Sequence, residues 1–302
     1  MRDWIDFGMV RDFAAENTAA YRLCTKPEGW AECYGGDALV SYKTAAAREE
    51  ILHELDEWAR LANQPFQRVF GRFLPKQNAE RNPPVLLLGT KEESLQTTVL
   101  ERGVCYGLDF GAGYSTGLFL DQRENRRFVR RGAPRRMLNC FAYTCAFSVV
   151  AGMTGAETLS IDLSKKSLSR GRENFMLNRL ATERHRFMAD DVVSVLPRLA
   201  RKGERFDMII LDPPTFSRSR TGRAWQVEHD FDKLLLSALE VAERDAKILL
   251  STNCTRLNER ALEVMGRFCL KASRRAGTFQ ATAKLPDFPP GVAARSIWMI
   301  LR

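Results

Sequence analysis

From residue 137 onward, short apolar runs alternate with stretches in which apolar residues recur at helical spacing. The predicted strands cover 137–141, 157–162, 185–189, 206–211 and 246–252, and the predicted helices cover 146–154, 165–178, 192–201, 228–243 and 257–272. Two further strands are expected near 277–284 and 294–301. Because strands alternate with helices, we expect a mainly parallel, doubly wound α/β sheet.

The first part of the chain has a less regular pattern. An amphipathic helix is expected over residues 1 to about 15, with Trp4, Phe7 and Phe13 on its apolar side. A second helix is expected over 44–61, where Ile51, Leu52, Leu55, Trp58 and Leu61 recur at helical spacing, and strands or turns over 19–43, 85–88 and 104–110. We therefore predict two domains, an α+β domain over 1–130 and a doubly wound domain over 131–302.

Polar residues follow the apolar strands of the second domain where ligands of open α/β sheets bind. The first turn lacks the glycines of a dinucleotide fingerprint, which disfavours a nicotinamide cofactor and favours one without phosphates, such as S-adenosylmethionine. We expect Asp162 to accept hydrogen bonds from both ribose hydroxyls and Asp191 to accept from the adenine amino group, with Asp212 as the third acidic strand end. Either of the first two could instead be a helix N-cap. The expected cofactor residues of the turns are Asn139, Phe141, Ala142, Tyr143, Thr144, Asp162, Leu163, Ser164, Asp191 and Asp212.

The run Asp212-Pro213-Pro214-Thr215-Phe216 predicts a site for a planar substrate. Prolines fix the backbone and lack N–H groups, so carbonyl groups can face a base edge while Phe216 stacks on the ring. Cys254 follows the fifth predicted strand and is a candidate nucleophile, although the frequency of buried cysteines favours a structural role. The expected catalytic residues are Asp212, Pro213, Pro214, Phe216 and Cys254.

The composition is that of a globular protein with a basic surplus. Of 302 residues 45% are hydrophobic and the net charge is +9, which favours a polyanion partner. Arg218, Arg220 and Arg223 follow Phe216 directly and are predicted to bind RNA. No apolar run is long enough to span a membrane, and seven scattered cysteines with three histidines give no metal-binding or disulfide pattern. We expect a cytoplasmic protein with no bound metal.

Several longer tracts resemble one family, the bacterial 23S rRNA methyltransferases that make 5-methylcytosine or 7-methylguanine. The matching tracts are Ser115 to Arg126, Leu138 to Thr144, Asp162 to Ser164, Asn174 to Asn178 and Phe206 to Phe216. The resemblance implies a Rossmann-like methyltransferase sheet with an antiparallel last strand, S-adenosylmethionine as cofactor and 23S rRNA as partner. It also implies that Gln122 and Arg123 line the cofactor pocket from the preceding domain. A homodimer is an open expectation.

The chain departs from the family pattern at Cys145, where glycine is usual. Glycine permits close approach or positive φ, and we expect the cysteine side chain to face the ligand turn and to affect cofactor affinity. The target atom is open between guanine N7, which the Thr215-Phe216-Ser217 run favours, and cytosine C5, for which Cys254 would be needed. Two other functions stay open: a small-molecule or protein methyltransferase, and a non-catalytic RNA-binding relative.

Overall fold

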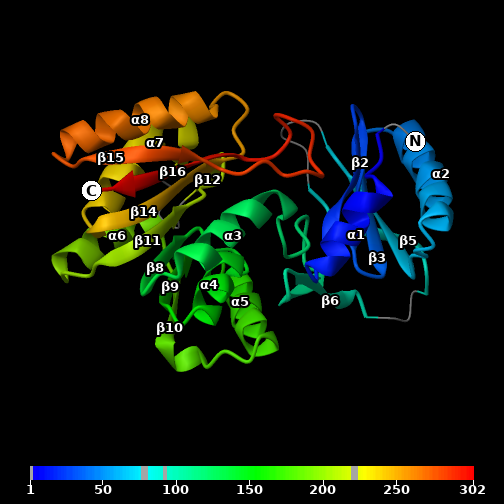
Figure 1. The fold of residues 1–302 in the computed structure, drawn as a ribbon, viewed down its shortest axis with the longest axis horizontal. Helices are drawn as coiled ribbons and strands as arrows, with labels where there is room; N and C mark the ends of the chain where they lie inside the picture. Colours follow the sequence, from blue (N-terminus) through cyan, green and yellow to red (C-terminus); the bar gives the residue numbers. More distant parts are fainter. Residues whose placement is uncertain (1–2, 76–80, 91–93, 219–223) are drawn as a thin grey trace. The chain divides into compact units, whose positions relative to one another are not determined.

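A computed structural model describes residues 3–75, 81–90, 94–218 and 224–302 (Figure 1). The chain divides into two compact units. Unit 1 comprises Met1–Leu120 with Leu285–Pro290, and unit 2 comprises Asp121–Lys284 with Gly291–Arg302. The predicted domain boundary lies at 130, whereas this division falls ten residues earlier and assigns a short segment near the C-terminus to unit 1.

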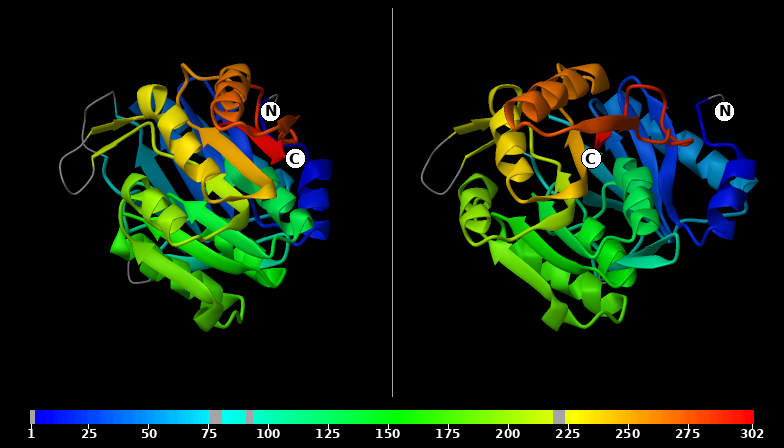
Figure 2. Two further views of the ribbon diagram at one scale, coloured as in Figure 1. Left: turned by 90° about the vertical axis from the view of Figure 1, so that its left-hand side faces the viewer. Right: turned by 60° about the vertical axis from the view of Figure 1, so that its left-hand side comes forward.

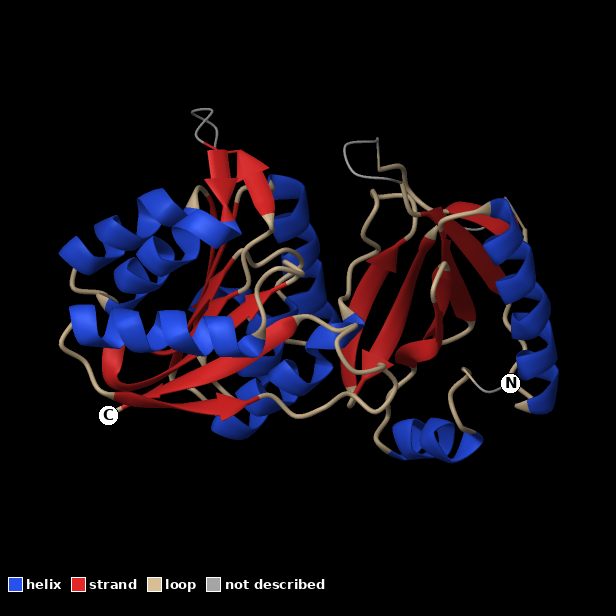
Figure 3. Cartoon of the chain, turned by 90° about the horizontal axis from the view of Figure 1, so that it is seen from above, coloured by secondary structure: helices blue, strands red, loops and turns tan. Residues whose placement is uncertain are grey.

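Unit 1 is built on a five-stranded sheet in the order β1-β2-β3-β4-β5. Its elements are α1 (Phe7–Ala15), β1 (Ala20–Lys26), β2 (Gly29–Tyr34), β3 (Asp37–Tyr42), α2 (Ala45–Leu61), β4 (Arg68–Phe73), β5 (Val85–Leu88), β6 (Gln96–Glu101) and β7 (Val104–Asp109). Only β3 and β4 of this sheet pair in parallel, and α2 forms the connection between them (Figure 3). Leu55, Trp58 and Ile51 of α2 pack with Val40 and Ala31 of the strands in one buried core.

The predicted helix over 44–61 is confirmed, but the N-terminal helix is shorter than expected. It begins at Phe7, because Asp6 is its N-cap and accepts a hydrogen bond from Gly8 N. Trp4 lies before the helix, where its backbone forms an isolated β-bridge with Cys24. The apolar side chain is therefore buried, as predicted, from a different backbone conformation.

Unit 2 contains a seven-stranded sheet in the order β10-β9-β8-β11-β14-β16-β15. Its strands are β8 (Arg136–Cys140), β9 (Glu157–Asp162), β10 (His185–Ala189), β11 (Phe206–Leu211), β14 (Ala242–Thr252), β15 (Gly277–Ala281) and β16 (Arg295–Leu301). The first five strands pair in parallel, whereas β16 runs antiparallel to both of its neighbours. The expected doubly wound fold with an antiparallel last strand is confirmed.

Helices cover both faces of this sheet (Figure 1). One face carries α3 (Arg123–Gly132), α4 (Ala146–Met153) and α5 (Lys165–Leu177), and the other carries α6 (Val192–Arg201), α7 (Val227–Leu239) and α8 (Glu259–Ala272). Two views from other directions show the same two layers (Figure 2). The short elements are η1 (Leu120–Gln122), η2 (Thr182–Arg184), β12 (Phe216–Arg218) and β13 (Ala224–Gln226). Because both faces are covered, the central strands are continuous apolar runs such as Met208–Leu211.

No helix in the described part of the chain is both long and apolar enough to cross a membrane. Within the same described residues, histidine, cysteine, aspartate and glutamate side chains nowhere gather in a group of three that could hold a metal ion.

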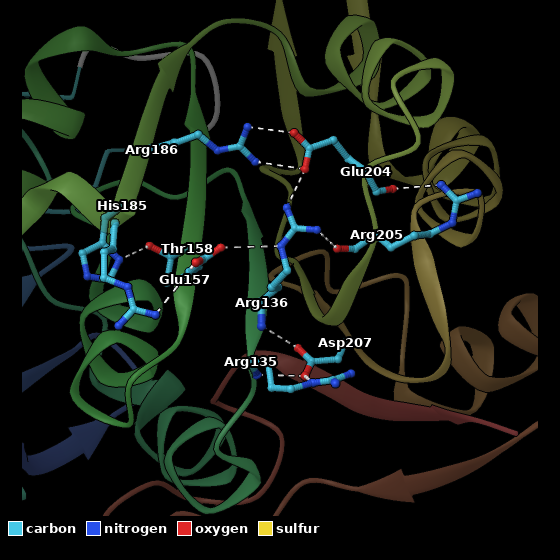
Figure 4. A network of polar contacts seen from close by, with 10 residues as sticks. Arg135, Arg136, Glu157, Thr158, His185, Arg186, Glu204, Arg205 and Asp207 are labelled. Atoms are coloured by element: carbon cyan, nitrogen blue, oxygen red, sulfur yellow. Dashed lines mark hydrogen bonds and ion pairs between the residues drawn. The ribbon is translucent and has the colours of Figure 1, made fainter.

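A polar network joins the amino-terminal ends of several parallel strands of unit 2 (Figure 4). Arg136 on β8 and Arg186 on β10 both bind the Glu204 carboxylate, with N–O distances of 2.6 and 2.8 Å. The backbone N–H groups of Arg135 and Arg136 donate to the Asp207 carboxylate at 2.8 and 2.9 Å. These two arginines therefore stabilise the sheet at the edge opposite to the carboxyl ends of the strands.

Glu204 is expected to contribute stability that is lost in acid. Hydrogen bonds from Arg186, with a smaller contribution from Arg136, lower its pKa to about 2, below the value of about 4.3 for an unfolded chain. The contribution is fully present above the unfolded pKa and is lost as the pH falls through the folded pKa. After allowance for solvent screening, Glu204→Gln should cost about 1 kcal/mol at pH 7 and progressively less as the pH falls from about 4 through about 2. Urea unfolding across pH measures this, with the exposed Glu173→Gln as control; a pH-independent loss would contradict it.

Candidate active site

The turn after β8 is held in an unusual backbone conformation. Phe141, Tyr143 and Cys145 all have positive φ, at 58°, 47° and 59°. Residues other than glycine rarely adopt this region, and each such residue costs on the order of 1 kcal/mol. Surrounding hydrogen bonds hold the turn: Asn174 on α5 donates to the Thr144 carbonyl at 2.9 Å, and Ala142 N donates to the Ile161 carbonyl at 2.9 Å.

Asp162 fixes the same turn from the end of β9. Its Oδ2 accepts a hydrogen bond from Tyr143 N, and its Oδ1 accepts from Ser164 N, both at 2.8 Å. Burial raises the pKa of this carboxyl, while the two backbone N–H groups act in the opposite direction. Ser164 is in turn the N-cap of α5 and accepts from Ser167 N. A carboxylate oxygen can accept more than one hydrogen bond, so Asp162 retains acceptor capacity for a ligand hydroxyl.

The side chain of Cys145 packs between the turn and α5, and its Sγ contacts the Tyr143 carbonyl of the turn at 3.8 Å, so its effect on cofactor affinity stays a prediction. The residue is fully buried, and its Sγ lies 2.5 Å from the position that a Cβ on Gly171 would take. Gly171 on α5 thus leaves the space that the cysteine occupies. Burial raises the pKa of the Cys145 thiol to about 12, which keeps it protonated and unreactive.

This packing predicts that Gly171→Ala destabilises the protein. The added methyl group would meet Cys145 Sγ at 2.5 Å and Cys145 Cβ at 3.0 Å. Overpacking of this kind costs about 1–3 kcal/mol. Cys145→Gly should restore most of that loss, since it removes both atoms and suits the positive φ. Denaturant unfolding of both single variants and the double variant measures the coupling between the two substitutions. If their effects on the free energy of unfolding simply add, Cys145 does not fill the space that Gly171 leaves.

Asp212 lies at the end of β11 in a hydrogen-bonded network. Gln122 Nε2 donates to Asp212 Oδ2 at 3.1 Å and to Ser251 Oγ at 2.8 Å. Asn125 Nδ2 donates to Gln122 Oε1 at 2.7 Å, and Trp298 Nε1 donates to Asn125 Oδ1 at 3.0 Å. Burial, with a smaller contribution from the charge of Asp121, raises the pKa of Asp212 to about 6, although hydrogen bonds from Ser251 and Gln122 and the charge of Arg126 oppose the shift. The Gln122–Asn125 tract therefore belongs to unit 2 and positions the Asp212 carboxylate.

The other expected cofactor residues have varied positions. Asn139 is buried, and its amide donates to Ser148 Oγ at 2.9 Å inside the sheet–helix layer. Asp191 is the N-cap of α6 and accepts from Val193 N and from Ser194 Oγ. Arg123 is fully buried. Leu163 and Phe141 are partly exposed, whereas Ala142 and Thr144 are buried.

The predicted substrate residues follow β11 and β14. Pro214 and Thr215 are exposed, and Phe216, at the start of β12, is 52% exposed. Cys254 is buried, and its Sγ donates to Glu228 Oε1 at 3.0 Å. Arg256 Nε binds the same oxygen at 2.6 Å. Sequence reasoning missed Glu228, because a single glutamate in the first turn of a helix resembles an ordinary favourable helix-dipole contact.

The predicted RNA-binding arginines are only partly covered by the structure. Arg218 ends β12, and Arg220 and Arg223 lie outside the described residues.

Comparison with known proteins gives consistent matches. The chain is 39% identical over 158 residues to "Putative ribosomal RNA large subunit methyltransferase YwbD" of Bacillus subtilis, covering 51% of this chain and 40% of that protein. It is 35% identical over 199 residues to ribosomal RNA large subunit methyltransferase I of Aeromonas salmonicida, covering 64% and 49%. The chain thus spans half or less of the length of these relatives.

A solved structure and a family model match over larger parts of the chain. The crystal structure of a "putative methyltransferase complexed with SAH" superposes with a TM-score of 0.78 at 26% identity, covering 98% of this chain and 78% of that one. The model of the S-adenosylmethionine-dependent methyltransferase family matches residues 52–262. With the sheet order and turn geometry described above, the chain belongs to the S-adenosylmethionine-dependent methyltransferase family.

Proposed function

We propose that this protein transfers a methyl group from S-adenosylmethionine to a base in large-subunit ribosomal RNA. The observation that carries the proposal is the Asp212-Pro213-Pro214-Thr215-Phe216 segment at the carboxyl end of β11. It combines a carboxylate held by Gln122 with an exposed aromatic ring. A ring that stacks on Phe216 while its edge meets fixed carbonyl groups has the shape of an unpaired nucleobase. The names of the relatives supply the class of RNA.

The residues of the β8 turn and the β9 end fit the cofactor. S-adenosylmethionine, when bound, supplies an electrophilic methyl group on sulfur. Asp162 would accept from its ribose hydroxyls, and the turn at Phe141 to Thr144 would present its backbone to it. The thiol of Cys145 leaves this surface clear because it packs against Gly171. The alternative that this protein is a non-catalytic RNA-binding protein, unable to bind the cofactor because of Cys145, is therefore not favoured by the packing.

Cytosine C5 is the target atom that the Cys254–Glu228 contact favours. Cytosine C5 becomes nucleophilic only after a thiolate adds to the neighbouring C6, which requires a cysteine with a proton acceptor. Cys254 donates its thiol proton toward the Glu228 carboxylate at 3.0 Å. In this reaction Sγ would bond to C6 as Glu228 takes the thiol proton, and C5 would gain the methyl group as S-adenosylmethionine becomes S-adenosylhomocysteine. The C5 proton would then pass to water, the Sγ–C6 bond would break, and Sγ would regain its proton from Glu228. Guanine N7 already carries a lone pair and needs no thiolate. Methylation at that atom would leave Cys254 and Glu228 without a role in the reaction.

Nucleoside mass spectrometry tests the proposal. Ribosomal RNA from a strain lacking the gene is compared with that from the parent, and the purified protein is incubated with the hypomethylated RNA and S-adenosylmethionine. We expect one 5-methylcytidine to be missing from the large subunit and restored in vitro. Loss of 7-methylguanosine would overturn the choice of atom alone. Unchanged RNA, together with no transfer in vitro, would overturn the RNA methyltransferase proposal.

A further inference from the structure

Arginine guanidinium groups and aromatic rings alternate along one end of the unit 1 sheet. Successive members lie 4.4 to 5.8 Å apart, measured from guanidinium carbon to ring centroid. We call this row the arginine–aromatic ladder; its members in order are Phe288, Arg22, Trp30, Arg72, Tyr114 and Arg81. All six residues belong to unit 1. Each guanidinium–ring contact is worth about 0.5–1 kcal/mol when exposed and more when desolvated.

The ladder forms on the sheet face that α2 does not cover. On β2, Ala31 and Cys33 point into the core beneath α2, so Trp30 and Glu32 point to the other face. Glu32 binds Arg22 at 3.1 Å and Arg72 at 3.3 Å. The Asp287 carboxylate also lies nearby and accepts the backbone N–H of Arg22. Three guanidinium groups thus share this face with two carboxylates. The outermost guanidinium group, that of Arg81, lies at the exposed end of the arginine–aromatic ladder.

Two donors inside the ladder have no hydrogen-bond partner among the residues that the structure describes. They are Nε of Arg22, a residue only 7% exposed, and the buried Nε1 of Trp30. A buried donor left unsatisfied costs about 1–3 kcal/mol. Hydrogen bonds hold Arg72 in place, from Nε to Ser41 Oγ at 3.0 Å and from Nη1 to the Tyr114 carbonyl at 3.4 Å. The planar groups of the ladder are therefore held in fixed orientations, although two unsatisfied donors reduce the stability of the fold.

The outer members of the ladder can reach a partner. Trp30, Arg72 and Tyr114 are partly exposed, and Arg81 is exposed. Unpaired bases stack on aromatic rings and on guanidinium planes, and the same guanidinium groups bind the phosphates between the bases. An acidic peptide would match the charge but has no planar groups to continue the stack.

We propose that the arginine–aromatic ladder of unit 1 binds a single-stranded segment of RNA by stacking and phosphate contacts. This inference rests on the proposed function, in that RNA is the substrate. It adds a second RNA-binding surface, separate in residues from the Phe216 segment. A base is expected to stack on the outer face of the Arg81 guanidinium, which the Tyr114 ring supports, and a phosphate to bind the edge of the same guanidinium.

Fluorescence anisotropy with a labelled oligouridine tests the proposal on the full chain. Tyr114→Ala removes the ring that holds the Arg81 guanidinium in place and should raise Kd about fivefold or more, the effect of losing one stacked base. Arg81→Gln should raise Kd and lower the slope of log K against log salt by about 0.7, the value for one phosphate contact on a single strand. The control is Arg48→Gln, which removes a guanidinium 5.6 Å from the Tyr42 ring outside the ladder and should leave Kd unchanged.

The outcomes separate the two proposals. If the parent protein binds oligouridine and both ladder variants bind equally tightly, the ladder proposal is overturned and the proposed function stands. If the parent binds no RNA and methylates none, both fail. Thermal melting and calorimetry with S-adenosylmethionine show whether each variant is folded. Should Tyr114→Ala fail to fold, the exposed Arg81→Gln decides alone, because its side chain makes little contact with the core.

Discussion

Asp162→Ala is expected to abolish measurable binding of S-adenosylmethionine. The substitution removes an acceptor for the ribose hydroxyls and also both hydrogen bonds that tie the β8 turn to β9. Charge-assisted hydrogen bonds contribute about 1.5–3 kcal/mol each, so a loss of at least about 3 kcal/mol, or more than 100-fold in Kd, is expected. Isothermal titration calorimetry measures it.

Two controls separate ligand contact from loop structure. Asp162→Asn keeps one oxygen acceptor and should give an intermediate loss of affinity. Asn174→Ala removes the support of the turn from α5, at the Thr144 carbonyl, without touching the carboxylate. If Asp162→Ala binds the cofactor with unchanged affinity and melts normally, the ribose assignment is wrong.

The sheet of unit 2 could be predicted because its local signals and its global packing agree. Runs such as Phe206–Leu211 are buried on both faces, and several of the following helices begin at a capping residue, as at Ser164 and Asp191. Parallel strands bring their carboxyl ends to one edge, so placing Asp162 and Asp212 near that edge required no knowledge of long-range contacts.

The helix α3 could not be predicted, because its sequence lacks an apolar stripe. Arg123, Glu124, Asn125 and Arg126 are nevertheless buried there. Buried charged residues are tolerated only with partners, and those partners come from distant positions, such as Ser296 and Trp298 for Asn125. A helix is predicted from the spacing of apolar residues that it buries. A helix that buries polar residues instead has no such spacing, and its sequence resembles that of an exposed arginine-rich segment.

The packing of Cys145 could not be predicted for a related reason. The family pattern predicts that its side chain faces the ligand turn, and Sγ does contact the Tyr143 carbonyl there. Its burial also depends on Gly171, twenty-six residues later, whose missing Cβ leaves room for the thiol. A compensating pair of this kind is visible only when both residues are seen together. Strands β4 and β6 were missed because Gly71 in β4 and the polar residues Gln96 to Thr98 in β6 interrupt their apolar pattern.

Cys254→Ser is expected to abolish methyl transfer while leaving cofactor affinity unchanged. An alcohol is a far weaker nucleophile than a thiolate, so the loss should be at least about 1,000-fold, as when other covalent nucleophiles are removed. Glu228→Gln should lower the rate as well, because the thiol then lacks the carboxylate that lies 3.0 Å away. Transfer of a radiolabelled methyl group to hypomethylated ribosomal RNA measures both variants.

Cys269→Ser is the matched control for this substitution. Cys269 is also a buried free cysteine, but its Sγ contacts the Asp232 backbone carbonyl at 3.6 Å and no carboxylate. Its replacement should affect stability alone. RNA containing 5-fluorocytidine provides an independent readout, since fluorine at C5 cannot leave as a proton does and the Sγ–C6 bond persists. A covalent protein–RNA adduct is expected with the parent protein and none with Cys254→Ser. Full activity of Cys254→Ser would instead assign the enzyme to guanine N7, where no thiol is required.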